Sequence, residues 1–273
     1  MRSTFFVLAA LFALPWSSAA AETVNFAGRS VVLDVPEGYC RLDPANTTDA
    51  QYIDAMKKVQ EGRNYIVFMF ASCDGLKAAR AGKLDQLTDS GAVMVIMNGG
   101  NIVAVPSMTR PQFIDEASRR VAVADTASVR NELRQRTEQV ALGVDLGGMK
   151  VLGVLKKDDL GVYIGFLLPP SAGANAPSIM SINAISLVNS LRISVVIGRP
   201  VVREGVADEL LTIEQRTVKR LIAANAATEA ASAESDSEGG ILEYAIIGAA
   251  VGGIGVPLGL LLRRSREAKR GSS

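Results

Sequence analysis

The sequence predicts an α+β fold: a largely antiparallel sheet with flanking helices, preceded by a signal peptide and followed by one transmembrane helix. Extended apolar runs occur in pairs, and short turn sequences join most of these pairs, which is typical of antiparallel strands. Amphipathic helical segments lie between groups of pairs, and we expect them to cover one face of the sheet. Apolar runs at residues 5–14 and 244–262 predict the two terminal segments.

The first 21 residues have the three parts of a secretory signal peptide. Arg2 supplies the positive charge, residues 5–14 supply a short apolar core, and Ala19-Ala20-Ala21 supplies a small-residue cleavage site before Glu22. The core is too short to span a bilayer, which takes about 20 residues. We expect cleavage, with an uncleaved anchor as the alternative, and a mature exported domain over residues 22–225.

Strands are predicted from apolar runs that end at glycine, proline or asparagine. The runs are residues 24–26, 31–35, 65–70, 93–97, 102–105, 149–155, 161–168, 182–188 and 191–197. Asn98-Gly99-Gly100-Asn101 is the strongest hairpin signal, because two adjacent glycines suit the tight turns that join antiparallel strands. Pro36-Glu37-Gly38 is expected to end the second strand.

Three capping boxes, in which a threonine is followed three residues later by a glutamine, predict helix starts. They are Thr48–Gln51, Thr109–Gln112 and Thr212–Gln215, with Gly62 expected to end the first helix and Asn225 the last. Two further helices are expected, one ending near Gly82 and one over residues 126–142.

The first hairpin has a partial likeness elsewhere. The pattern Val24-x-Phe26-x-Gly28, followed by Val35-Pro36-Glu37-Gly38-Tyr39, resembles the extrinsic photosystem P-protein-like fold group. That group also has an antiparallel sheet with flanking helices. The likeness covers residues 24–39 alone, so it implies no function and no site residue.

The C-terminal part predicts a single-pass anchor. Residues 226–240, rich in Ala, Ser, Glu and Gly, read as a flexible linker; residues 241–262 are expected to form the transmembrane helix, and residues 263–273 a basic cytoplasmic tail. Five Lys and Arg residues between Arg263 and Arg270 favour the cytoplasmic side. The expected location is therefore the cell (inner) membrane, in contact with membrane lipid, with the N-terminal domain periplasmic and the C-terminus cytoplasmic.

Four glycines follow one stripe of this predicted helix: Gly248, Gly252, Gly255 and Gly259. Small residues at such spacing let two membrane helices approach closely. We expect association with a protein partner or a second copy through this stripe, with plain anchoring as the alternative.

The two cysteines, Cys40 and Cys73, both lie in the exported part and are expected to form a disulfide. A redox pair is the alternative, but the spacing is far from Cys-x-x-Cys and neither cysteine lies in an electropositive stretch. The sequence therefore favours a structural bridge.

The chain contains no histidine, which excludes Ser-His-Asp and Cys-His nucleophilic pairs and histidine-ligated zinc. We expect no catalytic residue, no metal and no cofactor. Arg130 and Arg134 lie one helical turn apart and are candidate anion-binding residues, although four acids in the same stretch favour a solvated helix face. A net charge of +1 and export argue against nucleic acid as a partner.

Taken together, these patterns predict a membrane-anchored periplasmic binding or accessory domain of an envelope complex, and not an enzyme. The alternative is a histidine-free envelope enzyme that uses carboxylate, Lys or Ser-Lys chemistry.

Overall fold

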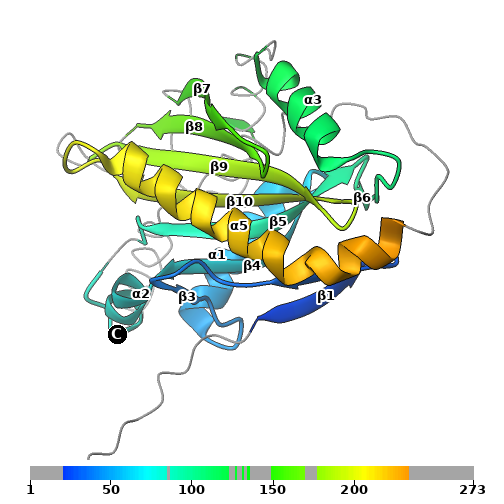
Figure 1. Ribbon diagram of the computed structural model, residues 1–273. Helices are drawn as coiled ribbons and strands as arrows, with labels where there is room; N and C mark the ends of the chain where they lie inside the picture. The colour runs from blue at the N-terminus through cyan, green and yellow to red at the C-terminus, as the bar shows by residue number, and fades with distance from the viewer. Residues whose placement is uncertain are drawn as a thin grey trace, which may run out of the picture.

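The computed structural model describes residues 21–84, 87–122, 149–169 and 177–233, and the helical positions 127, 131, 134 and 135. Over these residues the fold is α+β with a mostly antiparallel sheet and four helices (Figure 1). The helices are α1 (Thr47–Gln60), α2 (Cys73–Arg80), α3 (Arg110–Ala122) and α5 (Val206–Ala233). The strands are β1 (Glu22–Phe26), β2 (Arg29–Leu33), β3 (Tyr39–Arg41), β4 (Asn64–Ser72), β5 (Ser90–Asn98), β6 (Asn101–Ile102), β7 (Lys150–Lys157), β8 (Val162–Leu168), β9 (Ile179–Val188) and β10 (Leu191–Pro200).

The main sheet has the strand order β3-β4-β5-β10-β9-β8-β7, and β6 pairs with β5. Each neighbouring pair is antiparallel. The long hairpin β9–β10 lies in the middle, and a two-residue turn at Asn189 and Ser190, both with positive φ, closes it. The hairpin β1–β2 forms a separate two-stranded sheet.

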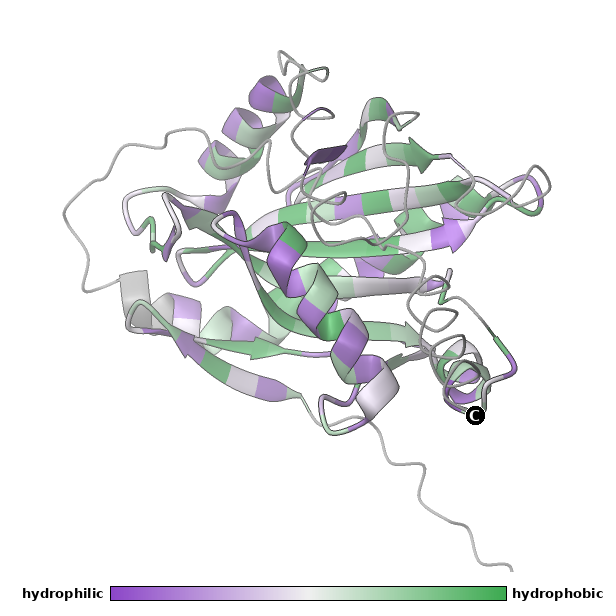
Figure 2. Cartoon of the chain, turned by 180° about the vertical axis from the view of Figure 1, so that it is seen from behind, coloured by the Kyte–Doolittle hydropathy of each residue, from purple (hydrophilic) through white to green (hydrophobic). Residues whose placement is uncertain are grey.

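Helices cover both faces of the main sheet, so the expectation that they cover one face is wrong. Residues of α1, α2 and α3, such as Met56, Leu76 and Phe113, share one core with the sheet. Residues of α5, such as Leu210 and Val218, share a second core with the opposite face and with β2. Every residue of β9 is buried, so this strand requires cover on both sides. Seen from behind, the central strands are predominantly hydrophobic (Figure 2).

Two local predictions are confirmed, one of a hairpin turn and one of a helix start. Asn98 pairs with Asn101 across Gly99 and Gly100, whose φ values are +56° and +82°. The capping box at Thr109 also forms: the Thr109 backbone N–H donates to Gln112 Oε1 at 2.9 Å, and the Gln112 N–H donates to Thr109 Oγ1 at 3.4 Å. Both signals depend only on neighbouring residues.

The other two predicted helix starts are wrong. Asn46, rather than Thr48, caps α1, because its side-chain oxygen accepts the backbone N–H groups of Thr48 and Asp49. Thr212 lies inside α5, which begins at Val206, and its hydroxyl donates to the carbonyl of Asp208 one turn earlier. A threonine can satisfy its hydroxyl in this way without starting a helix.

Asn225 does not end α5, which continues to Ala233 and so includes the first residues of the expected linker. The Asn225 side chain is buried, and its amide forms the two hydrogen bonds with β2 that the backbone of a neighbouring strand would otherwise form. Its Oδ1 accepts the Val32 backbone N–H, and its Nδ2 donates to the Val32 carbonyl, each at 2.8 Å. This amide attaches the β1–β2 hairpin to α5.

The predicted signal core, transmembrane helix and basic tail, and most of the predicted 126–142 helix, lie outside the described residues. None of the helices in the described part of the chain combines the length and apolar character needed to cross a membrane.

Candidate functional site: a charged pocket beside α5

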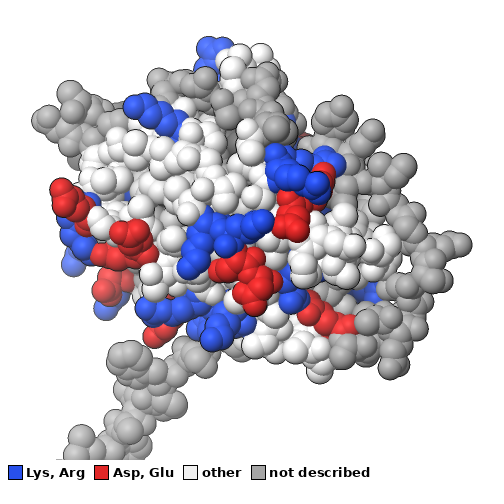
Figure 3. All heavy atoms as spheres, turned by 45° about the horizontal axis from the view of Figure 1, so that its top comes forward, with Lys and Arg blue, Asp and Glu red and all other residues white. Residues whose placement is uncertain are grey.

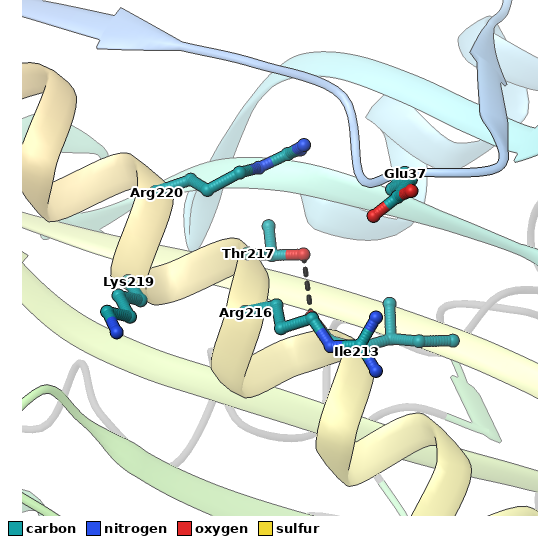
Figure 4. Close-up of a pocket in the computed structure, with 6 residues that line it drawn as sticks. All are labelled: Glu37, Ile213, Arg216, Thr217, Lys219 and Arg220. Carbon is teal, nitrogen blue, oxygen red and sulfur yellow. Dashed lines mark hydrogen bonds between the residues drawn. The ribbon is translucent and has the colours of Figure 1, made fainter.

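A pocket of about 270 Å³ lies between α5 and the loop that joins β2 to β3 (Figure 4). Glu37 contributes from the loop, and the other lining residues come from α5: Ile213, Arg216, Thr217, Lys219 and Arg220. Successive spacings of three and four positions place Ile213, Arg216 and Arg220 on one side of the helix. The adjoining side, with Leu210 and Val218, packs on the sheet, and Ile213 lies at the border between the two sides.

The loop wall of the pocket is held by a tight turn. The Tyr39 backbone N–H donates to the Pro36 carbonyl at 3.1 Å, and Gly38 has a φ of +84°, which glycine adopts at little cost. Glu37 therefore stands exposed at the corner of the turn. Arg220 ties the loop to α5, since its Nη2 donates to the Val35 carbonyl at 2.7 Å and lies 3.5 Å from the Asp34 carboxylate.

Three charged side chains at this pocket have no charged partner among the described residues. Arg216 and Lys219 form no ion pair there, and neither does Glu37, although all three line the same pocket. The Thr217 hydroxyl donates to the Ile213 carbonyl at 2.8 Å, drawn as a dashed line in Figure 4. Acidic and basic side chains are interspersed over the face seen in Figure 3, so the pocket is a local charge arrangement rather than part of a broad field.

Glu214 lies on the inward side of the same helix turn. It is fully buried, and neither carboxylate oxygen has a hydrogen-bond partner. Burial raises the pKa of Glu214 well above its ordinary value. Burial also raises the pKa of Tyr163, with the nearby carboxylates of Asp158 and Glu214 adding to the effect. Sequence reasoning assigned Glu214 to a capping box and missed its burial.

A second polar cluster connects the start of α5 to the sheet. The Tyr39 hydroxyl donates to Asp89 Oδ1 at 2.6 Å, while Arg199 donates to Asp89 Oδ2 at 3.1 Å and to the Tyr39 oxygen at 3.0 Å. Arg199 also lies 3.4 Å from Glu209 at the beginning of α5. Because these groups satisfy one another, the cluster holds β3, β10 and α5 together.

Cys40 and Cys73 form the predicted disulfide, with an S–S distance of 1.99 Å, which joins β3 to the start of α2. Arg134 is an exposed helical position, and Arg130 lies outside the described residues, so their shared face stays a prediction. The glycine stripe also lies outside them: Gly248, Gly252, Gly255 and Gly259. In the described ranges no group of three or more acidic or cysteine side chains is placed to hold a metal ion.

Sequence reasoning also missed the pocket residues Arg216, Lys219 and Arg220. The available signal was the spacing of three and four from Arg216, which makes Lys219 and Arg220 its neighbours on the helix surface. Such a pattern usually indicates a solvated surface. Only the packing of the Pro36–Tyr39 turn beside the helix makes it a pocket.

Comparison with protein-family models and with curated proteins gives no match for this chain.

Proposed function

We propose that the chain is a membrane-anchored periplasmic binding domain of an envelope complex, without catalytic activity, that holds an anionic group in the pocket beside α5. The observation that carries the proposal is the pair of unpaired cations, Arg216 and Lys219, next to the apolar side chain of Ile213. Both cations are exposed, and together they give this pocket a local positive potential that favours an anionic group.

The chemistry of these side chains suits a carboxylate or a phosphate. A guanidinium presents a planar fork that matches both groups, and a lysine ammonium adds a point charge that is tolerant of geometry. A volume of about 270 Å³ is just below the range that holds drug-sized ligands. The occupant is therefore a small molecule or the end of a larger one.

The proposed location rests on the sequence and on the disulfide. Residues 1–21 and 241–262 and the basic tail predict export with one membrane anchor, and a Cys40–Cys73 bridge is typical of an oxidising compartment. In this arrangement the tail contacts membrane lipid, and the glycine stripe of the anchor associates with a protein partner or a second copy.

Binding is tested by calorimetric titration of the full-length chain in detergent with acetate and with inorganic phosphate. Arg216→Gln should weaken anion binding by about tenfold, because a charge-assisted hydrogen bond is lost. Lys58→Gln is the matched control, since it removes a cation from an exposed position of α1 on the opposite face of the sheet. Equal weakening by both variants, or none by Arg216→Gln, would contradict the proposal.

Two further measurements separate this function from the alternatives. A histidine-free enzyme would convert the ligand, whereas a binding domain returns it unchanged after prolonged incubation. Protease added to intact spheroplasts should degrade residues 22–240 and spare the tail; protection of that region would overturn the proposed topology.

A further inference from the structure

Glu37 faces the cationic wall of the pocket without neutralising it. Figure 4 shows its carboxylate pointing from the loop toward α5. It forms no ion pair with Arg216, Lys219 or Arg220, although all four line the pocket. Arg220, the side chain that reaches the loop, instead bonds the Val35 carbonyl and lies beside Asp34.

The loop that carries Glu37 and the helix that carries the cations are each fixed in place, and this keeps their charges apart. The loop is fixed at one end by the Arg220 contact and at the other by Tyr39, which is buried and bonded to Asp89. The helix is fixed by its apolar side, which packs on the sheet. Glu37 and Arg216 therefore lie on opposite walls of the pocket, and neither backbone wall is free to move toward the other.

The hydroxyl of Thr217 adds a second hydrogen-bond acceptor to that of Glu37. It donates its proton to the Ile213 carbonyl, so toward the pocket it offers only lone pairs. Glu37 and Thr217 thus form a half that accepts hydrogen bonds. Arg216 forms a half that donates them, Ile213 supplies an apolar surface, and the Lys219 side chain points away from Glu37 (Figure 4).

The accepting and donating halves of the pocket together indicate which class of ligand it binds. This inference rests on the anion-binding function proposed above. We infer that the pocket binds a zwitterion, in which an ammonium group lies on Glu37 and Thr217 while a carboxylate or phosphate lies on Arg216. A purely anionic ligand would place its charge close to that of Glu37. Short peptides with free ends and phosphoethanolamine headgroups share the required chemistry.

The test titrates the full-length chain with dialanine, N-acetyl-dialanine, O-phosphoethanolamine and inorganic phosphate. Each zwitterion should bind about three- to fivefold more tightly than the probe that lacks its ammonium, which is the effect of one exposed ion pair. A higher affinity for dialanine than for O-phosphoethanolamine identifies the end of a peptide as the ligand, and the reverse order identifies a headgroup.

Glu37→Gln should remove the preference for the ammonium group while N-acetyl-dialanine and phosphate still bind. The control Glu204→Gln removes an exposed carboxylate outside the pocket and should keep the preference. If N-acetylation has no effect on the native chain, or if Glu37→Gln changes all four affinities alike, the zwitterion inference fails while anion binding stands. If none of the probes binds, both proposals fail.

Discussion

Replacing Glu214 with methionine should stabilise the protein. The carboxyl group of Glu214 is fully buried, and neither oxygen has a partner at good hydrogen-bond geometry among the described residues; the Ile197 backbone offsets the effect of burial on its pKa only in part. Methionine has a similar length, is apolar and flexible enough to fill the same space, and favours helices as strongly as glutamate. The substitution therefore removes an unsatisfied polar group without opening a cavity under α5.

The expected gain follows from the free-energy penalty of burying a polar group without a partner, about 1–3 kcal/mol. For a chain of this size each 1 kcal/mol shifts the melting temperature by about 2–4 °C. Glu214→Met should then melt about 2–12 °C higher than the native chain at neutral pH.

The gain should grow with pH. Because burial raises the pKa of Glu214 in the folded state, the folded chain keeps this proton above pH 4.5 while the unfolded chain releases it. The folded state then holds more protons than the unfolded state, so the free energy of unfolding of the native chain falls as pH rises. The fall ends once the pH exceeds the raised pKa. Tyr163 on the facing side does not reverse this sign, since burial raises its pKa as well and the folded chain keeps that proton too.

Urea unfolding followed by circular dichroism from about pH 4 to about pH 9 measures both effects. The control is Glu204→Met, which removes an exposed acid shortly before α5. A lower free energy of unfolding for Glu214→Met at every pH would refute the reasoning, because it would mean that the carboxyl makes a favourable contact. The same pH dependence in variant and native chain would refute the assignment of the proton to Glu214.

Three other outcomes are expected. Cys40→Ser combined with Cys73→Ser should lower the free energy of unfolding by about 3–4 kcal/mol in urea, through the loss of loop closure, and an unchanged midpoint would contradict this. Asn225→Leu should lower the free energy of unfolding by about 2–4 kcal/mol and speed hydrogen exchange of the β2 amides. Exchange rates equal to those of the native chain would argue against the attachment of β2 to α5 through Asn225. Gly252→Leu with Gly255→Leu should reduce crosslinked association without affecting membrane insertion, and undiminished crosslinking would leave a plain anchor.

Local signals predicted most of the strands and the turns between them. The Asn98–Asn101 turn and the Thr109 capping box were predictable because they depend on residues only three positions apart. The pairing of the two cysteines was predictable from their number and from the export that the sequence predicts.

The features that failed depend on contacts between distant residues. Asn225 extends the helix instead of ending it because its amide binds Val32, 193 positions earlier in the chain. The Arg220 contact with Val35 that ties the loop wall of the pocket to α5 spans 185 positions. Glu214 differs again, because a lone acid on an apolar helix side carries no local sign of burial.

The attachment of α5 also determines how the domain would bear mechanical load. Tension applied at the C-terminal end of the helix first loads the contacts of Glu229. Arg110 donates to both of its carboxylate oxygens, and the Asn189 backbone N–H donates to one of them. The tension next meets the Asn225 amide on β2. Both restraints lie between the pulled end and Arg216, so tension must break these hydrogen bonds before it reaches the pocket.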